Sequence, residues 1–367
     1  MTLARRSWVE VTYSGKDISE DLAPYLLGAT YTDNQGGKAD EVSLELQDRE
    51  GLWRDDWLPG TGNTVEVRIH AENWGEGGDS LFCGTFTIDK FGMGGPPSKV
   101  TLGGVSIPTG LAARKTKRSR AWENATLQTI AGDVASSARM PLVWDAPAGQ
   151  VLDRVDQRSE TDLAFLGRLC SANNLALKVT GGQLVVWDLA AYALRDEFTT
   201  YTLGESRVLG WSLDVKAFLS TPRVKVVYSD PVSGVVQEST ATATEDPDDP
   251  LGLSHPVMEE GILGELGVEA APAIIPQSFD TDAAEVVRQR CRSKAEAEAL
   301  AKARLAATQS HQAEGTLNVV GDVRLVAGNS IRLVGWGKLD GKYLVETATH
   351  SISGGYTVSA KIKRSST

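Results

Sequence analysis

Short segments in which apolar and polar residues alternate occupy both ends of the chain. In the N-terminal part they cover residues 8–13, 41–46, 64–69, 81–91 and 99–102. Strict alternation over four to eight residues is the pattern of a strand with one face buried and the other in water. Glycine-rich turns separate these segments, which is typical of a small barrel or sandwich. We therefore predict a first, tube-like β-barrel domain over residues 1–108.

The pattern changes in the middle of the chain. Apolar residues recur at helical spacing between Ala125 and Ala138, which predicts a helix there. Ser159, with an acid three residues later, predicts a second helix start through a hydroxyl cap. Gly181-Gly182 then joins two apolar segments, and two glycines supply the positive φ angles of a tight hairpin turn. We predict a compact α+β domain over residues 109–195.

Alternation returns after residue 196 and continues to the C-terminus, which predicts a second β-barrel domain over residues 196–367. Two segments interrupt it. Residues 242–282 are acidic and broken by prolines, and we expect a long surface loop or an extended arm there. Residues 293–307 begin with a capping box and are rich in alanine, which predicts a helix. The predicted fold class is mainly β with an α+β insert, that is, two related small β-barrels plus a compact α+β domain.

The two β regions share a sequence pattern that suggests an internal duplication. In each, a Gly-Asn turn enters an alternating strand, and a glycine two residues before an aromatic residue begins the next strand. Further along, Val100 aligns with Thr357 without a gap. Any two antiparallel hairpins can look alike, but the preserved order favours two related barrels. The repeat signature consists of Gly62, Asn63, Gly84, Phe86, Gly328, Asn329, Gly341 and Tyr343.

Composition narrows the class of protein. A chain of 367 residues, 41% hydrophobic and 23% charged, is long enough for two or three globular domains. It has no apolar run of about 18 residues and no apolar stretch after Arg5 and Arg6, so we expect neither a membrane span nor a secretory signal. The net charge of -11 argues against a nucleic-acid binder. Cys83, Cys170 and Cys291 are far apart, which argues against a disulfide framework or a zinc site.

Several segments together resemble the late-control protein D family of phage tail hubs. This family is related to the N-terminal hub part of VgrG-type proteins. Residues 159–166 look like the family's Asp-x-x-Phe-Leu helix, and Lys117–Thr126 also fits. The C-terminal likeness covers residues 294–298, 315–317, 321–322, 326–329, 339–346, 350–352 and 356–358. The resemblance follows the family's order over most of the chain, and its specificity lies in the combination of motifs.

The resemblance implies a structural, non-enzymatic baseplate hub in a virion tail tip or baseplate, assembled in the host cytoplasm. It implies a homotrimer, whose six related barrels could join a sixfold tail tube to a threefold central spike. The expected partners are the tail tube or distal tail protein, the spike as a separate protein, the tape-measure protein and the baseplate wedge proteins. We expect no sequence-specific nucleic acid, no stable membrane insertion and no cofactor. Whether the tail is contractile, and whether it belongs to a phage, a tailocin or another injection system, stays open.

We find no catalytic or metal-binding motif in the sequence. His70, His255, His311 and His350 lack an HExxH-type spacing, and there is no G-x-S-x-G elbow. Gly92-Met93-Gly94-Gly95 precedes prolines and a strand, so a hairpin loop is favoured over a phosphate loop. Carboxylates are plentiful, so a tail-associated cell-wall hydrolase stays an alternative, as does a carbohydrate-binding host-recognition protein.

Two surfaces are candidate interfaces. The basic cluster fits contact with a neighbouring subunit or a solvated linker better than contact with phosphate. Among nine tryptophans, a pair in a turn-rich, charged stretch is the best candidate for an interface anchor. The candidate interface residues are Arg114, Lys115, Lys117, Arg118 and Arg120 in the basic cluster, and Trp53 and Trp57.

Overall fold

The structure is a computed structural model. It describes residues 4–55, 57–60, 62–74, 80–107, 112–149, 151–215, 223–229, 236–242, 284–288, 294, 297–298, 300–302 and 313–365. Residues 243–282 of the predicted acidic loop, and Cys291, lie outside the described residues. The N-terminal elements are β1 (Arg6–Tyr13), β2 (Lys16–Asp17), α1 (Ser19–Leu22), β3 (Leu26–Asn34), β4 (Glu41–Gln47), a 3-10 turn (Leu52–Arg54), β5 (Thr64–Glu72), β6 (Ser80–Gly94) and β7 (Lys99–Val105).

The middle elements make up what we call the α+β insert. They are α2 (Ala112–Lys115), β8 (Lys117–Ala125), α3 (Leu127–Ala138), β9 (Leu142–Asp145), β10 (Leu152–Thr161), α4 (Asp162–Ala172), β11 (Leu175–Thr180), β12 (Gln183–Asp188) and α5 (Leu189–Ala193). The C-terminal elements are β13 (Thr199–Thr202), β14 (Val208–Val215), β15 (Arg223–Ser229), β16 (Val236–Thr242), β17 (Ala284–Arg288), β18 (Ala313–Val320), β19 (Ser330–Val334), a 3-10 turn (Gly337–Leu339), β20 (Gly341–Ile352) and β21 (Tyr356–Arg364).

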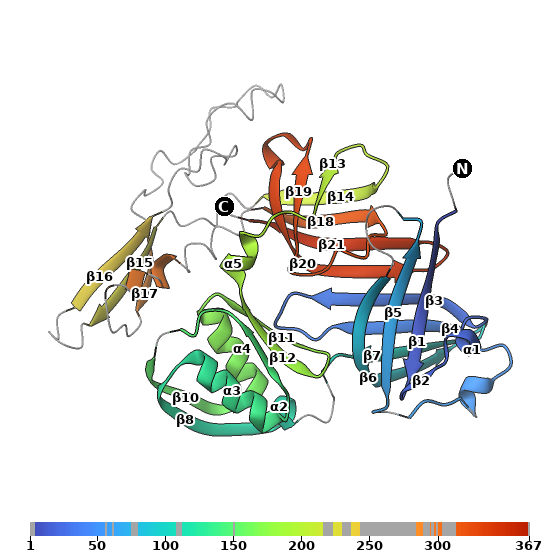
Figure 1. Ribbon diagram of the computed structural model, residues 1–367, viewed down its shortest axis with the longest axis horizontal. Helices are drawn as coiled ribbons and strands as arrows, with labels where there is room; N and C mark the ends of the chain where they lie inside the picture. Colours follow the sequence, from blue (N-terminus) through green and yellow to red (C-terminus); the bar gives the residue numbers. More distant parts are fainter. Residues whose placement is uncertain are drawn as a thin grey trace.

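The predicted fold class, mainly β with an α+β insert, is confirmed. Strands from both ends of the chain form one sheet of 13 strands in the order β14-β18-β21-β20-β3-β4-β7-β6-β5-β1-β2. The remaining two strands branch from it, because β19 pairs with β20 and β13 pairs with β19. Strands β3, β4, β7, β6 and β5 form what we call the first unit. Strands β14, β18, β21, β20 and β19 form the second unit in the same relative order. Instead of two separately closed barrels, the described residues form two curled units joined through β3 and β20 (Figure 1).

The repeat-signature residues hold the same places in the two units. The Gly62 and Gly328 amides donate to the carbonyls of Ile88 and Val345 at 3.0 and 2.8 Å, and both glycines have a φ of 91°. The Ile88 and Val345 amides donate back to the carbonyls of Asn63 and Asn329. In the ladders that follow, Val67 pairs with Gly84 and Leu333 with Gly341, while the aromatic rings of Phe86 and Tyr343 are both buried.

The repeat strand formed by β7 in the first unit and β21 in the second has a different register from the one predicted. A β-bulge interrupts the ladder between Ile88 and Lys90 and another interrupts it between Val345 and Thr347, at equivalent positions. Counting from these bulges, Val100 is equivalent to Val358 and not to Thr357. Burial agrees, since Val100 and Val358 are both buried whereas Thr357 is exposed. The ungapped alignment of this strand was wrong by one residue because the second copy has one residue more before it.

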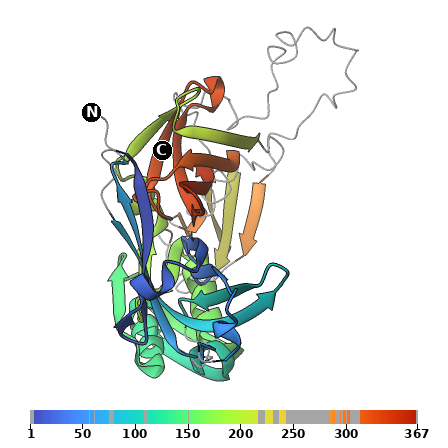
Figure 2. The same cartoon turned by 90° about the vertical axis from the view of Figure 1, so that its right-hand side faces the viewer.

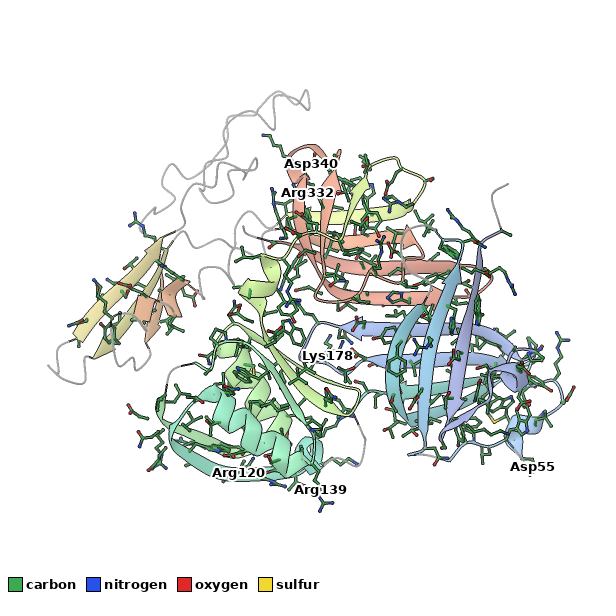
Figure 3. All side chains as sticks on the ribbon, in the orientation of Figure 1. Asp55, Arg120, Arg139, Lys178, Arg332 and Asp340 are labelled. Atoms are coloured by element: carbon green, nitrogen blue, oxygen red, sulfur yellow. The ribbon has the colours of Figure 1, made fainter. Side chains whose placement is uncertain are left out.

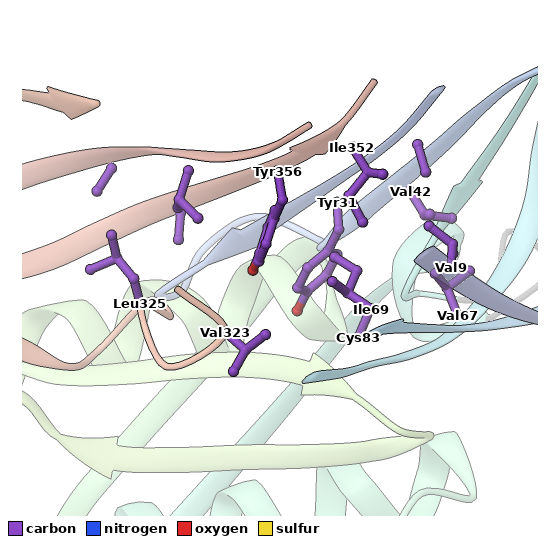
Figure 4. Close-up of a cluster of buried hydrophobic side chains, with 14 of the residues drawn as sticks. Val9, Tyr31, Val42, Val67, Ile69, Cys83, Val323, Leu325, Ile352 and Tyr356 are labelled. Atoms are coloured by element: carbon purple, nitrogen blue, oxygen red, sulfur yellow. The ribbon is translucent and has the colours of Figure 1, made fainter. Parts of the chain in front are cut away.

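A single hydrophobic core spans both units. Valines and isoleucines of β5 and β1 lie in it together with Tyr31 of β3 and Tyr356 of β21 (Figure 4). The α+β insert has its own core, in which Ile130 and Val134 of α3 meet Phe165 of α4 and the strands of the β11–β12 hairpin. A third, small core lies in the sheet of β15, β16 and β17, with Ala297 and Ala301. The described residues within 293–307 are helical, as predicted.

Helices α3 and α4 of the insert, with β8 and β10, lie at the end of the molecule away from the second unit, as Figures 1 and 2 both show. The hairpin of the insert turns at Gly181-Gly182, which have φ angles of 56° and 73°, as predicted. The predicted helix cap is two residues early. Thr161 caps α4 by accepting from the Ala164 amide, whereas Ser159 sits at a bulge of β10 with a φ of 50°.

The two turn glycines give a test of the repeat. Replacing Gly62 or Gly328 by Ala should lower the free energy of unfolding by about 1–3 kcal/mol each, because a side chain at positive φ is strained. Gly132 in α3 has ordinary φ, and a Cβ added there would have nothing within 4 Å, so Gly132→Ala should be neutral or stabilising. Urea unfolding of the three variants measures this, and similar effects at all three positions would contradict the argument.

Candidate functional site

The joint between the two units brings polar and aromatic groups of β3, β20 and β21 together. Six residue pairs join β3 to β20 antiparallel, from Asn34 with Thr347 to Ala29 with Ile352. Across it the Tyr31 and His350 rings stack with centroids 5.8 Å apart, and His350 Nδ1 lies 2.7 Å from the Tyr356 hydroxyl. Burial lowers the pKa of His350 to about 4, so this ring is neutral at physiological pH.

Beside the joint, two buried carboxylates share one lysine, and we call Asp33, Asp40 and Lys178 the junction triad. Lys178 Nζ of β11 pairs with Asp33 Oδ1 and lies 3.1 Å from Asp40 Oδ2. The side chains of Asp33 and Asp40 are 6% and 1% exposed. In Figure 3 Lys178 lies where the insert meets the first unit. A charge in such a place is stable only when it is paired.

Backbone groups from three parts of the chain complete the junction triad. Asp33 Oδ2 accepts from the Ala327 amide of the second unit at 2.9 Å, and Asp40 Oδ1 accepts from the Asn34 amide at 2.9 Å. The Ser106 hydroxyl accepts from the Asp40 amide and donates to the Val179 carbonyl of the insert, both at 3.0 Å. First unit, second unit and insert are therefore fastened at a single buried point.

The electrostatics of the triad are unbalanced, since two acids face one base. Burial raises the pKa of Asp40 to about 6, the Asp33 charge adds to this, and Lys178 opposes it. Burial alone lowers the pKa of Lys178, but the two carboxylates outweigh it and hold that pKa above its ordinary value. The ammonium therefore stays charged, and Asp40 is the group that takes up a proton near neutral pH.

Two sheet edges carry large apolar side chains that are open to solvent. On β14, Leu209 is 57% exposed, Trp211 46% and Val215 39%. Near the end of β6, Met93 is 44% exposed. Among the described residues β14 pairs only with β18, and β6 beyond Ile88 pairs only with β7. Exposed edges with apolar side chains invite another strand.

The tryptophan pair predicted as an interface anchor divides between core and surface. Trp53 is 4% exposed and belongs to the core, which corrects its prediction as an interface residue. Its ring meets that of Trp57 edge-on at 5.4 Å, and Trp57 is half-buried with Tyr25 against it. Trp53 thus lies in the core and Trp57 packs against it. For Trp57 an interface role stays a prediction.

The basic cluster is partly neutralised within the insert. Arg120 Nη2 donates to buried Asp162 at 2.6 Å and Arg118 Nε lies 3.6 Å from the same carboxylate. Both arginines fasten β8 to the start of α4, so a structural role accounts for them. Arg114, Lys115 and Lys117 are exposed at α2 and the start of β8, and their role as interface residues stays a prediction.

The described part of the chain offers little conventional site chemistry. No group of three or more His, Cys, Asp or Glu side chains among these residues could hold a metal ion. None of its helices is long and apolar enough to cross a membrane. Cys83 and Cys170 are buried thiols, and burial raises the pKa of Cys170 to about 12. Gly92–Gly94 belongs to β6 and leads into a turn, consistent with the predicted hairpin.

Sequence reasoning missed β3 and the junction triad. The strand's core-facing positions include Asp33, so its alternation does not resemble that of a buried strand. Lys178 stands in a hairpin strand where a solvated lysine is the ordinary expectation. A possible signal was the isolated Asp33 and Asp40 flanking the Gly36-Gly37 turn, but pairing them with Lys178 requires the fold.

No family model matches the chain. It is 31% identical over 172 residues to the probable baseplate hub protein of Escherichia phage P2, a match that covers 46% of this chain and 42% of that protein. The chain thus spans less than half the length of this curated relative. The relationship confirms the predicted resemblance to phage baseplate hub proteins.

Two solved structures have the same fold. A tail protein from Neisseria meningitidis gives a TM-score of 0.67 at 14% identity, covering 98% of this chain and 96% of that one. The E. coli c3393 protein, described as a component of the type VI secretion system with structural similarity to bacteriophage T4 tail proteins, gives 0.53 at 10% identity, covering 98% and 77%. At these identities the likeness is one of fold alone.

Removing the lysine of the junction triad should be strongly destabilising. Lys178→Met keeps the side chain's length but leaves two buried carboxylates without a cation, which costs about 3–5 kcal/mol of unfolding free energy. Lys99→Met is the matched control, because Lys99 pairs with Glu45 on the surface and should cost at most about 1 kcal/mol. Guanidinium unfolding measures both, and equal losses would show that the triad is no fastening point.

The raised pKa of Asp40 predicts a pH dependence of stability. The folded protein holds this proton up to about pH 6, whereas the unfolded chain loses it near 3.8, so Asp40 destabilises the fold as pH rises between these values. The free energy of unfolding of Asp40→Asn, relative to that of the unmodified protein, should therefore rise by roughly 2–3 kcal/mol as the pH goes from 4 to 7. Unfolding at several pH values measures it. The exposed Glu41→Gln variant is the control. If the unfolding free energies of Asp40→Asn and of the unmodified protein change in parallel with pH, the raised pKa of Asp40 is refuted.

Proposed function

We propose that this protein is a structural, non-enzymatic baseplate hub, in which three copies form a ring that adapts a sixfold tail tube to a threefold central spike. The observation that carries the proposal is the equivalence of the two units, which share strand order, turn hydrogen bonds and bulge positions. A chain with two equivalent units contributes two similar surfaces per copy, so three copies present six.

The similarity to a phage hub protein over part of the chain, and the shared fold with a tail protein over nearly all of it, supports this role. The proposed place is the tail tip or baseplate of a virion or a related injection system, reached after assembly in the host cytoplasm. The proposed functional parts keep the predicted boundaries, with tube-like parts at 1–108 and 196–367 and the α+β part at 109–195.

The proposed partners fall on two faces of the ring. The tail tube or distal tail protein would lie against the six related units, and the spike would follow the threefold arrangement of the three inserts. The tape-measure protein and the wedge proteins are expected at the lumen and the outer rim. The exposed residues Arg114, Lys115 and Lys117 on the insert suit contact with an acidic neighbour.

The ring predicts a defined mass. Light scattering of the purified protein, alone or mixed with its cognate spike protein, should show an assembly containing three chains of 39.3 kDa. A monomer or a dimer under both conditions would contradict the ring. The same preparation incubated with purified peptidoglycan should release no soluble fragments, and a release that persists in repeated purifications would favour the hydrolase alternative.

A further inference from the structure

The equivalence of the two units extends to their outermost strands, β3 and β14. Both strands have a bulge in the ladder to the next strand, between Leu26 and Gly28 and between Val208 and Gly210. Beyond each bulge the glycine pairs with the equivalent residue of β4 or β18. Following the ladders outward gives the equivalent positions along the two strands, which are Ala29 with Trp211, Thr30 with Ser212, Tyr31 with Leu213, Thr32 with Asp214, and Asp33 with Val215.

The same reasoning aligns the ends of β6 and β20. Near the bulge, β6 stops pairing with β5 and β20 stops pairing with β19. From there the equivalent residues are Phe91 with Ala348, Gly92 with Thr349, Met93 with His350, and Gly94 with Ser351. In β20 this segment pairs with β3 and makes the joint between the units. In the described residues the equivalent segment of β6 has an open edge, and so does β14, the equivalent of β3.

One joint is therefore filled within the chain, while both halves of an equivalent joint are vacant in the part of the chain that the structure describes. We infer that β14 of one copy pairs antiparallel with the end of β6 of the next copy, as β3 pairs with β20 inside each chain. The inference rests on the proposed ring and specifies its subunit contact. Transferring the register of the internal joint gives the pairs Asp214 with Gly92, Leu213 with Met93, Ser212 with Gly94, and Val215 with Phe91.

The side chains at the vacant edges fit this contact. Trp211, Leu213 and Val215 stand opposite Leu317, Gly315 and Ala313, so they point to the core side of the sheet. Phe91 already packs against the core, and Met93 is on the same side two residues on. Pairing the two edges would make the core continuous from one copy to the next, and would cover Trp211, Val215 and Met93, which are 46%, 39% and 44% exposed.

The difference in chemistry between the two joints points to a contact between chains. The internal joint has Tyr31, Asp33 and His350 on its core side, where Asp33 and His350 are hydrogen-bonded and Tyr31 stacks on His350. The equivalent positions at the vacant edges are Leu213, Val215 and Met93. An association between separate chains must overcome lost rotational and translational freedom, and burial of apolar surface provides that free energy without needing a prearranged polar partner.

A second copy of this chain is the occupant that both edges select together. A strand from another protein could cover β14 or β6, but it would leave the other edge open. Pairing β14 with β6 of the next copy fills both edges with one contact and repeats head to tail, which is the arrangement that closes a ring. The steric conditions are also met, since Gly92 and Gly94 have nothing within 4 Å of a Cβ position.

Disulfide trapping tests the register. In a Cys291→Ser background, we would combine Asp214→Cys with Gly92→Cys in one chain, and Ser212→Cys with Gly94→Cys in another. Directly opposed residues bring Cβ atoms within about 4–5.5 Å, close enough for a disulfide. The matched control, Asp214→Cys with Gly94→Cys, slips the pair by two residues to about 7–8 Å. After mild oxidation, non-reducing gels should show a reducible covalent trimer at least fivefold more abundant for the in-register pairs.

The outcomes separate the joint from the ring. A trimeric mass without enrichment of the in-register pairs overturns the joint and leaves the hub in place. Monomers by light scattering, for the unmodified protein alone and with the cognate spike protein, contradict the ring and the joint together.

A second variant keeps the inference falsifiable if a cysteine pair fails to fold. Met93→Lys should weaken self-association at least tenfold, whereas Leu194→Lys, at a 72% exposed position away from both edges, should not. Equal effects of the two charges would overturn the inference.

Discussion

The pairing of β3 with β20 is the constraint from which the rest of the molecule is arranged. It joins segments more than three hundred residues apart in the sequence into one sheet, and makes one core of what could have been two. A slip of one residue would put Tyr31 and His350 on opposite faces of the sheet, so that one of the two rings would leave the core and a polar neighbour would enter it. The buried Tyr31, His350 and Tyr356 therefore fix the register as well as stabilise the joint.

The junction triad places the insert on this frame. The insert has its own core and its own short sheets, so its internal stability does not require the β units. What positions it is Lys178 with Asp33 and Asp40, helped by Ser106 and the Val179 carbonyl. Buried charges are costly when they are misplaced, so such a cluster favours one orientation over the alternatives. In the proposed hub this precision would have a use, since the geometry of the insert relative to the two units would determine what the three copies present together.

Much of the fold could be predicted because most strands have one face in the core and one in water. Strands such as β4, with Val42, Leu44 and Leu46 facing inward, alternate cleanly and were found. Strand β3 was not, because its inward face carries Asp33 and its joint function replaces apolar residues with polar ones. The signature glycines pointed to the duplication, but the alternation gave no signal of the one extra residue in the turn between β20 and β21, which shifts the strand after it by one position. Contacts such as Asp33 with Lys178 depend on the folded chain, so no pattern along the sequence contains them.

The two units differ in chemistry at the edges that are equivalent to the internal joint. Where the neighbour is the other unit of the same chain, folding holds the partners together, and buried polar groups such as Asp33, His350 and Tyr356 find hydrogen-bond partners. At the vacant edges, where Val215 and Met93 are exposed, apolar side chains tolerate a lone chain in water and also suit the inferred contact with a second copy. An unpaired carboxylate or imidazole at the same positions would have to be desolvated on each association. Equivalent strands can therefore provide an internal joint where their edge is polar and hydrogen-bonded, and an assembling edge, in the inferred contact, where it is apolar.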